Sequence, residues 1–403
     1  MKHACLRFCL LGFALLLLLC FAACTRDGDT EVSVEPTPVI ELREEDYIDD
    51  GAELADYVDA YDFLRQSDGT YFVSAGRNRY RTVLVIPATY DDLPVTGIAA
   101  GGFENCKHLR HITLPESIET VGERAFNGCA ALEAVVVSSH IVSIGNRAFF
   151  GCAALAECSL PAALIEIGEE AFYGCESLRS LNVSDRVTRL GDRAFYGCGL
   201  QTVLITSGAT ALGSNLFSQC TSLTTVVLPE NITTIPAEFF SGCTSLTRVL
   251  LPDTVTEIGD GAFSGCRTLA GIDLPRSLTA LGRGAFEGCD ALTSVVLPDT
   301  VTTIGDRCFY NCGQLRSLTL STGLTSIGAN AFGGCLALSG VTVPAAVRSI
   351  GANAFLGCDA LVALHFQTTA GWYANGSGAA VDLTDPAETA ALFRAGDAGF
   401  IRR

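Results

Sequence analysis

Twelve cysteines recur at a constant spacing, and their thiols are the side chains of this chain that are best placed to do chemistry. Each follows a phenylalanine by three residues, and successive cysteines are 23 residues apart, with one step of 22. Such a column of thiols could form disulfides, hold a metal ion, supply a nucleophile or be buried as free thiols. The twelve are Cys106, Cys129, Cys152, Cys175, Cys198, Cys220, Cys243, Cys266, Cys289, Cys312, Cys335 and Cys358.

Two further cysteines favour the buried interpretation of this column. Cys158 stands where other repeats carry an inward valine, and Cys308 stands where they carry alanine. Cysteine is therefore used interchangeably with small apolar residues, as a buried thiol would be. Disulfides between some cysteines of neighbouring coils are an alternative. Stacked coils would place the Cα atoms of equivalent residues about 5 Å apart, within the range that a disulfide allows. Metal or redox chemistry is the least favoured, and we expect no metal and no cofactor.

The remaining sequence has no pattern typical of a catalytic site. The histidines are scattered, and no serine, aspartate or cysteine recurs beside them at a spacing that would build a nucleophile and its base. The sequence also lacks a phosphate-binding glycine loop. We expect no catalysis, and a thiol-based enzyme or redox protein ranks third among the hypotheses.

The elements that position the cysteines follow from the repeat. One unit reads L-x-x-V-x-L-P-x-x-V-x-x-I-G-x-x-A-F-x-x-C, and twelve copies lie between Ile98 and Cys358. The alternation in L-x-x-V-x-L predicts a short strand of a parallel sheet, which proline then ends. The G-x-x-A-F-x-x-C segment is expected to form a helical or 3₁₀ turn that directs phenylalanine and cysteine inward. Its glycine is expected to permit close packing, because Pro236 replaces it once and proline cannot adopt a positive φ.

Stacking of the repeats is required, because a single repeat cannot bury its own apolar side. Twelve coils at roughly 4.8 Å each would share one continuous core about 55 Å long. A period of 23 residues is typical of leucine-rich repeats. We therefore expect a leucine-rich repeat solenoid with a parallel β-sheet of short strands on one face and helical or 3₁₀ turns on the other.

The first 23 residues predict an export signal. Basic residues precede an apolar run from Phe8 to Ala23, which is shorter than the roughly 20 residues of a spanning helix. The run ends in Phe21-Ala22-Ala23-Cys24, which resembles a bacterial lipobox, although leucine is usual where Phe21 stands. We expect a lipoprotein-type signal peptide over residues 1–23 and lipidation of Cys24, with ordinary signal cleavage near Ala23 as the alternative. Lipidation would anchor the protein to a membrane without spanning it.

The rest of the chain is expected to divide into four segments. Residues 24–40 are polar and acidic and predict a flexible tether. Residues 41–97 are expected to form an N-terminal cap, with a solvated acidic stretch, a hairpin at Asp68-Gly69 and a degenerate half-repeat. The repeat array occupies residues 98–366. Residues 367–403 are expected to cap its end, with Trp372 in the covering plug and Asp385 opening a short helix.

The repeat unit resembles the BspA-like leucine-rich repeat family over about Thr82 to Phe366. Twelve in-phase copies make this match specific. The resemblance implies a right-handed solenoid, export to the cell surface, and adhesion to host or matrix proteins or to other bacteria. The family supplies no catalytic residues, and because its members bind different partners, the resemblance does not imply a particular ligand.

The candidate binding surface lies on the outward positions of the predicted strands. The fifth strand position is apolar in three consecutive repeats and again beyond one aspartate, which predicts a partner-binding stripe if these side chains are exposed. The alternative is that such residues merely favour strands. The candidate residues are Leu204, Val227, Arg248, Leu250, Asp273 and Val296.

The charge of the chain restricts its partners. It has 26 basic and 44 acidic residues, a net charge of −18, and loss of Lys2 and Arg7 with the signal gives 24 − 44 = −20. This charge opposes nucleic acid or anionic lipid as the main partner. We expect a surface-displayed, membrane-anchored adhesion or protein-interaction module with a protein ligand. The alternative is a structural spacer of the cell envelope without a specific ligand.

Overall fold

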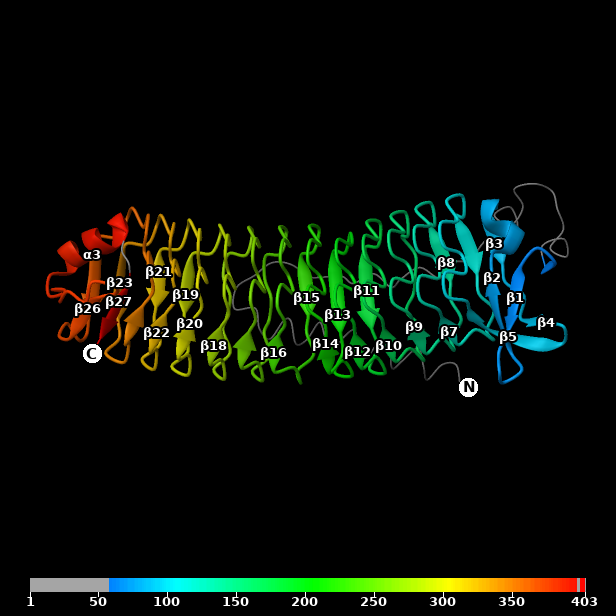
Figure 1. Ribbon diagram of the computed structural model, residues 1–403, viewed down its shortest axis with the longest axis horizontal. Helices are drawn as coiled ribbons and strands as arrows, with labels where there is room; N and C mark the ends of the chain where they lie inside the picture. Colours follow the sequence, from blue (N-terminus) through cyan, green and yellow to red (C-terminus); the bar gives the residue numbers. More distant parts are fainter. Residues whose placement is uncertain (1–57, 397–398, 403) are drawn as a thin grey trace, which may run out of the picture. The chain divides into compact units, whose positions relative to one another are not determined.

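The computed structural model describes residues 58–396 and 399–402. Within this part the chain forms the expected leucine-rich repeat solenoid, and Figure 1 shows consecutive coils side by side along the array. The predicted signal peptide, the tether and Cys24 lie outside the described residues, as does the acidic stretch up to residue 57.

The L-x-x-V-x-L segments form parallel strands on one side of the solenoid, which we call the strand face. Within each group of paired strands, a strand lies in register with the equivalent residues of the next coil, as Leu204 does with Val227. The strands group as β3 (Val83–Val85), β6 (His111–Thr113) and β8 (Ala134–Val136); β11 (Ser180–Val183), β13 (Thr202–Ile205) and β15 (Thr225–Val227); β19 (Ser294–Val296) and β21 (Ser317–Thr319); and β23 (Gly340–Val343) and β25 (Ala363–Phe366).

The strand face is interrupted where continuous pairing was expected. Residues 248–250 and 271–273 form no strand, although they align with β15 and β19 in neighbouring coils. Residues 157–159 likewise form no strand, and only Glu157 makes an isolated bridge to Ala134. Gly271 and Asp273 are residue types that strands disfavour, which accounts for the break in their coil. That break also removes one pairing partner from the coil that contains Arg248.

The V-x-x-I segments form a second parallel ladder that was not expected. These strands are mostly two residues long, and they pair because the same extended segment recurs in phase in every coil. The first half contains β5 (Leu93–Ile98), β7 (Thr120–Val121), β9 (Ser143–Ile144), β10 (Glu166–Ile167), β12 (Arg189–Leu190) and β14 (Ala211–Leu212). The second half contains β16 (Thr234–Ile235), β17 (Glu257–Ile258), β18 (Ala280–Leu281), β20 (Thr303–Ile304), β22 (Ser326–Ile327) and β24 (Ser349–Ile350).

The G-x-x-A-F-x-x-C segments make up the remaining side, which we call the turn face. They direct phenylalanine and cysteine inward as expected, but their backbone forms consecutive turns rather than a regular helix. Arg124 shows why, because its φ of 56° is left-handed and breaks the helical path. Backbone hydrogen bonds also join the coils here, as from Phe126 N to Ala148 O at 2.7 Å.

Close packing explains the conserved position of glycine within this repeat unit. A Cβ atom on Gly168 would lie 2.6 Å from the backbone nitrogen of Asn146 in the preceding coil. Its φ is not in the left-handed region, so the space and not the backbone conformation requires glycine. The structure thereby confirms the packing interpretation made from Pro236.

The core is a continuous stack of side chains along the solenoid. The rings of Phe149 and Phe172 stack with centroids 5.0 Å apart, and similar contacts link the phenylalanines from Phe103 to Phe355. These rings are fully buried. The repetition of one buried ring in every coil gives the array a single core instead of separate domain cores.

The two ends of the described array are covered by non-repeat structure. At the N-terminal end, β1 (Asp62–Arg65) and β2 (Tyr71–Ser74) form an antiparallel hairpin, and β2 pairs with β5. The 3₁₀ helix η2 (Gly76–Tyr80) and β4 (Thr89–Tyr90) complete this region. At the other end, helix α3 (Pro386–Ala395) packs beside β26 (Trp372–Ala374) and β27 (Phe400–Arg402).

The structure defines the contacts of the two residues singled out in the C-terminal region, Trp372 and Asp385. Trp372 is buried, and its indole nitrogen donates to Thr368 O at 2.9 Å, so this side chain covers the end of the core. The Asp385 carboxylate accepts hydrogen bonds from the backbone nitrogens of Ala387 and Glu388 at the start of α3. No helix in the described part of the chain is long and apolar enough to cross a membrane.

Candidate functional site

The six residues proposed for binding occupy the strand face, but their exposure differs. Leu204 on β13 and Val227 on β15 are half-buried, since they lie in regular paired strands. Arg248 and Asp273 are exposed in two neighbouring coils that form no strand on the strand face. Leu250 is 39% exposed and Val296 is 65% exposed. The apolar stripe is therefore most accessible at its C-terminal end.

A shallow groove of about 570 Å³ lies where the strand face is interrupted. Arg248, Asp273 and Val296 line it, so the structure brings together three of the six predicted residues. Leu204, Val227 and Leu250 do not line it. Gly271 forms part of its floor, and a Cβ atom placed there would meet no atom within 4 Å. The missing side chain and the absent strand together create the depression.

The groove combines charged and apolar groups. Arg248 and Arg276 supply cationic groups, and Asp273 supplies a carboxylate. Within the described residues no carboxylate lies within ion-pair distance of Arg248, so its guanidinium keeps its five hydrogen-bond donors available. The exposed valine beside these charges is the kind of apolar contact point that protein interfaces use. The arrangement can bind a protein surface, and it contains no nucleophile with a base.

The column cysteines are buried and carry free thiols. Burial raises the pKa of Cys152, Cys266, Cys312 and Cys358 to about 12, because a thiolate would lose its hydration there. Cys308 is also buried, whereas Cys158 is half-buried beside the core. Thiols with pKa values this high are poor nucleophiles near neutral pH.

One cluster of polar side chains has the composition of a hydrolase triad without its geometry. Ser139 Oγ donates to Glu116 Oε2 at 2.7 Å, and His140 Nδ1 lies 3.0 Å from the same oxygen. In a catalytic triad the serine would instead contact the histidine nitrogen that does not face the carboxylate. Both His140 and Glu116 are largely exposed, at 66% and 68% of the side chain. This cluster therefore forms a surface hydrogen-bond network.

No three or more histidine, cysteine, aspartate or glutamate side chains gather into a possible metal site in the part of the chain that the structure describes. His111 and His365 belong to no such group. His111 lies 3.7 Å from Glu133, and His365 is exposed on β25.

Repeated strands, a single stacked core and in-phase coils define a leucine-rich repeat solenoid. Sequence comparison matches the family described as the BspA type leucine-rich repeat region, in six copies, over residues 88–169, 142–270 and 233–362. The chain belongs to this BspA-type leucine-rich repeat family. Comparison with curated proteins gives no match.

Solved structures of bacterial leucine-rich repeat proteins resemble this chain. One from Bacteroides ovatus has 26% identity and a TM-score of 0.54, covering 76% of this chain and 87% of that one. A leucine-rich cell surface protein from Faecalibacterium prausnitzii has 26% identity and a TM-score of 0.51, covering 77% and 94%. The pneumococcal vaccine antigen PcpA shares the fold at 21% identity and a TM-score of 0.56, covering 76% and 85%.

Proposed function

We propose that this protein is an exported, lipid-anchored adhesion module that binds a protein partner through its strand face. The observation that carries this proposal is the groove at the interruption of the strand face, where Arg248, Asp273 and Val296 converge. Apolar surface beside an arginine without an ion-pair partner is typical of the energetically dominant part of a protein interface.

Export and anchoring rest on different observations. The N-terminal sequence supports a lipoprotein signal with Cys24 as the lipidated residue. The relative from Faecalibacterium prausnitzii is described as a cell surface protein, which supports display outside the cell. A membrane anchor followed by the acidic tether would hold the solenoid at a distance from the lipid surface.

Binding of the mature chain, residues 25–403, to a panel of matrix proteins, host cells and bacterial surfaces tests this proposal. We expect saturable binding that Val296→Asp abolishes while circular dichroism shows retained folding. Val362→Asp is the matched control, because Val362 is 66% exposed and does not line the groove. Equal binding by both variants would place the site elsewhere, and no binding by any of them would favour the spacer alternative.

A further inference from the structure

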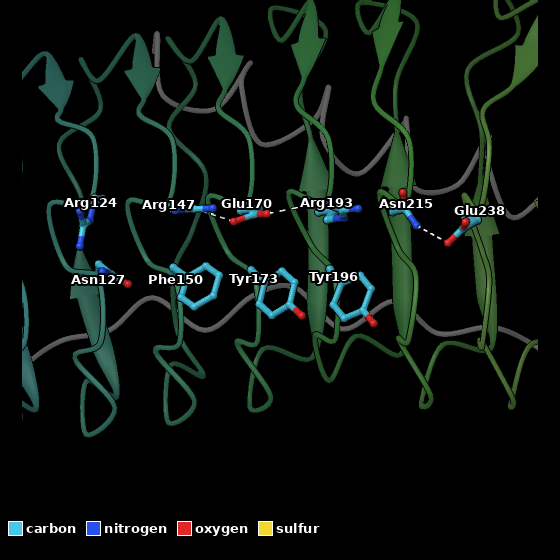
Figure 2. A pocket seen from close by; sticks show the side chains of 10 residues that line it. All are labelled: Arg124, Asn127, Arg147, Phe150, Glu170, Tyr173, Arg193, Tyr196, Asn215 and Glu238. Carbon is cyan, nitrogen blue, oxygen red and sulfur yellow. Dashed lines mark hydrogen bonds and ion pairs between the residues drawn. The ribbon is translucent and has the colours of Figure 1, made fainter.

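A second groove of about 550 Å³ lies on the turn face, remote in the coil from the strand face. Figure 2 shows its side chains in two rows, one polar and one in which three aromatic rings follow Asn127. The aromatic row consists of Phe150, Tyr173 and Tyr196 from three consecutive coils. Their rings stack with centroids 4.7 and 4.6 Å apart, at interplanar angles of 10° and 4°.

One ring face at the end of this row lacks an aromatic neighbour. The position equivalent to Tyr196 is Ser218 in the next coil and Ser241 in the one after, so the stack ends at Tyr196. Beside it, Asn215 Nδ2 donates to Glu238 Oε2 at 2.6 Å, and Arg193 completes the surroundings. Burial and the neighbouring Tyr173 raise the pKa of Tyr196, which keeps its hydroxyl protonated as a donor.

The polar row occupies backbone positions that would favour glycine. Its six members have φ between 53° and 56°, in the left-handed region that side chains rarely adopt. Gly101, Gly261 and Gly284 take this conformation in other coils, so glycine is compatible with the repeat. Arg307, Asn330 and Asn353 take the same conformation in coils outside the groove, so a polar side chain here is compatible with the repeat in general. The groove differs from those coils because six such side chains follow one another beside a row of aromatic rings. The six are Arg124, Arg147, Glu170, Arg193, Asn215 and Glu238.

Charge balance decides which ligand class this groove fits. Glu170 pairs with Arg147 at 2.7 Å and with Arg193 at 3.8 Å, and Glu104 pairs with Arg124. With Glu238, three glutamates thus offset three arginines, so the groove has little net attraction for a polyanion. The guanidinium groups stay about half exposed and keep free donors, while the amide and carboxylates keep acceptors.

We propose that this groove binds a neutral, linear oligosaccharide, with Tyr196 stacking against one sugar ring and Arg193, Asn215 and Glu238 hydrogen-bonding to its hydroxyls. A pyranose presents a C–H face that the negative face of an aromatic ring attracts, and its hydroxyls need both donors and acceptors. Five coil steps separate Arg124 from Glu238, so the groove extends for about 24 Å, long enough for several sugar units. Its volume lies within the ~300–1,000 Å³ typical of ligand sites.

Native affinity gel electrophoresis tests this proposal, with mature protein in gels that contain laminarin, galactomannan, arabinoxylan, dextran or, as a polyanion, heparin. We expect at least one neutral polysaccharide to retard the protein. Tyr196→Ala and Asn215→Ala/Glu238→Ala should each weaken retention about tenfold, equivalent to about 1.4 kcal/mol. Tyr310→Ala is the matched control, because Tyr310 has the same repeat position and contacts Arg307 outside the groove.

Thermal unfolding of each variant shows whether it still folds. Because two different variants change the groove, the test remains possible if one of them does not fold. Absence of retention by every neutral polysaccharide, or retention that both groove variants preserve, would overturn the proposal. Retardation by heparin alone would also overturn it in favour of an anionic ligand. Val296→Asp should bind polysaccharide normally, which separates this site from the strand-face groove.

Discussion

The thiol of Cys129 lies 3.0 Å from the backbone carbonyl oxygen of Phe103 in the preceding coil and donates a hydrogen bond to it. The same oxygen accepts the backbone N–H of Cys106 at 3.2 Å, so it has two donors. Equivalent thiol contacts recur up to the bond from Cys358 to Phe332. Cysteine thus fills a small apolar space and also supplies a weak donor that valine or alanine lacks.

Replacement of one column cysteine should measure this double role. Cys243→Ala removes buried sulfur contacts and the hydrogen bond to Phe217 O, and we expect a loss of about 1–2 kcal/mol in the free energy of unfolding. Urea denaturation followed by circular dichroism measures it. Cys158→Ala, at a half-buried position, should cost less. An equal loss in the free energy of unfolding at the two positions would show that a cysteine of the column contributes no more stability than Cys158 does.

Thiol reagents should distinguish the buried column from the single half-buried cysteine. In the native protein without residues 1–24, we expect Cys158 to react first, because its side chain is half-buried whereas the column thiols are buried and inaccessible to the reagent. All the cysteines should react after denaturation. Mass spectrometry after timed alkylation measures the order, and rapid native labelling of any column cysteine would contradict the assignment and reopen a catalytic role.

Alkaline pH should destabilise the solenoid through these thiols. The folded pKa of Cys152 and Cys266 is about 12, above the ordinary value of 9.0. Between pH 9 and pH 12 these thiols lose their protons in the unfolded chain but keep them in the folded chain. The free energy of unfolding is therefore unaffected by these thiols below pH 9 and decreases as the pH rises toward 12. Urea midpoints at pH 7, 9 and 10.5 measure the decline. A Cys152→Ala/Cys266→Ala variant should show a shallower decline, and an unchanged slope would assign it to other groups.

Two glycines offer a direct test of coil packing. Gly168→Ala would place a methyl group 2.6 Å from Asn146 N and should cost about 1–3 kcal/mol. Gly271→Ala is the matched control, since its Cβ would enter open space, and it should be neutral or slightly stabilising. Urea denaturation of both variants measures the difference, and similar stability would show that the coils can separate to accommodate a methyl group.

The periodicity of the sequence predicted the coil and the inward phenylalanines and cysteines, because these depend on a pattern within one repeat. The interruption at Gly271 was harder to predict, since strand pairing depends on residues 23 positions apart in two coils. The second ladder was missed because two-residue strands have too short a pattern to recognise. The aromatic row of Phe150, Tyr173 and Tyr196 did leave a signal, as adjacent repeats carry a ring at the same position.

The thiol hydrogen bonds could not be inferred from composition. Cys158 and Cys308 replace apolar residues and suggest that cysteine acts only as a hydrophobe. The bond from Cys129 to Phe103 depends on the offset between coils, which brings a carbonyl 26 residues earlier in the chain within reach of the thiol. Sequence reasoning therefore gave the location of the column and missed the polar contact that the column makes.

The most direct test of the proposed function is the affinity of a partner from the surface panel for three proteins, measured by biosensor at constant salt. These are the mature chain, Arg248→Glu in the strand-face groove, and Arg267→Glu, an exposed charge change outside it. We predict that Arg248→Glu weakens binding about tenfold or more, through loss of a central arginine, whereas Arg267→Glu binds as the unaltered chain does. Equal affinity of all three proteins would contradict a binding site at this groove.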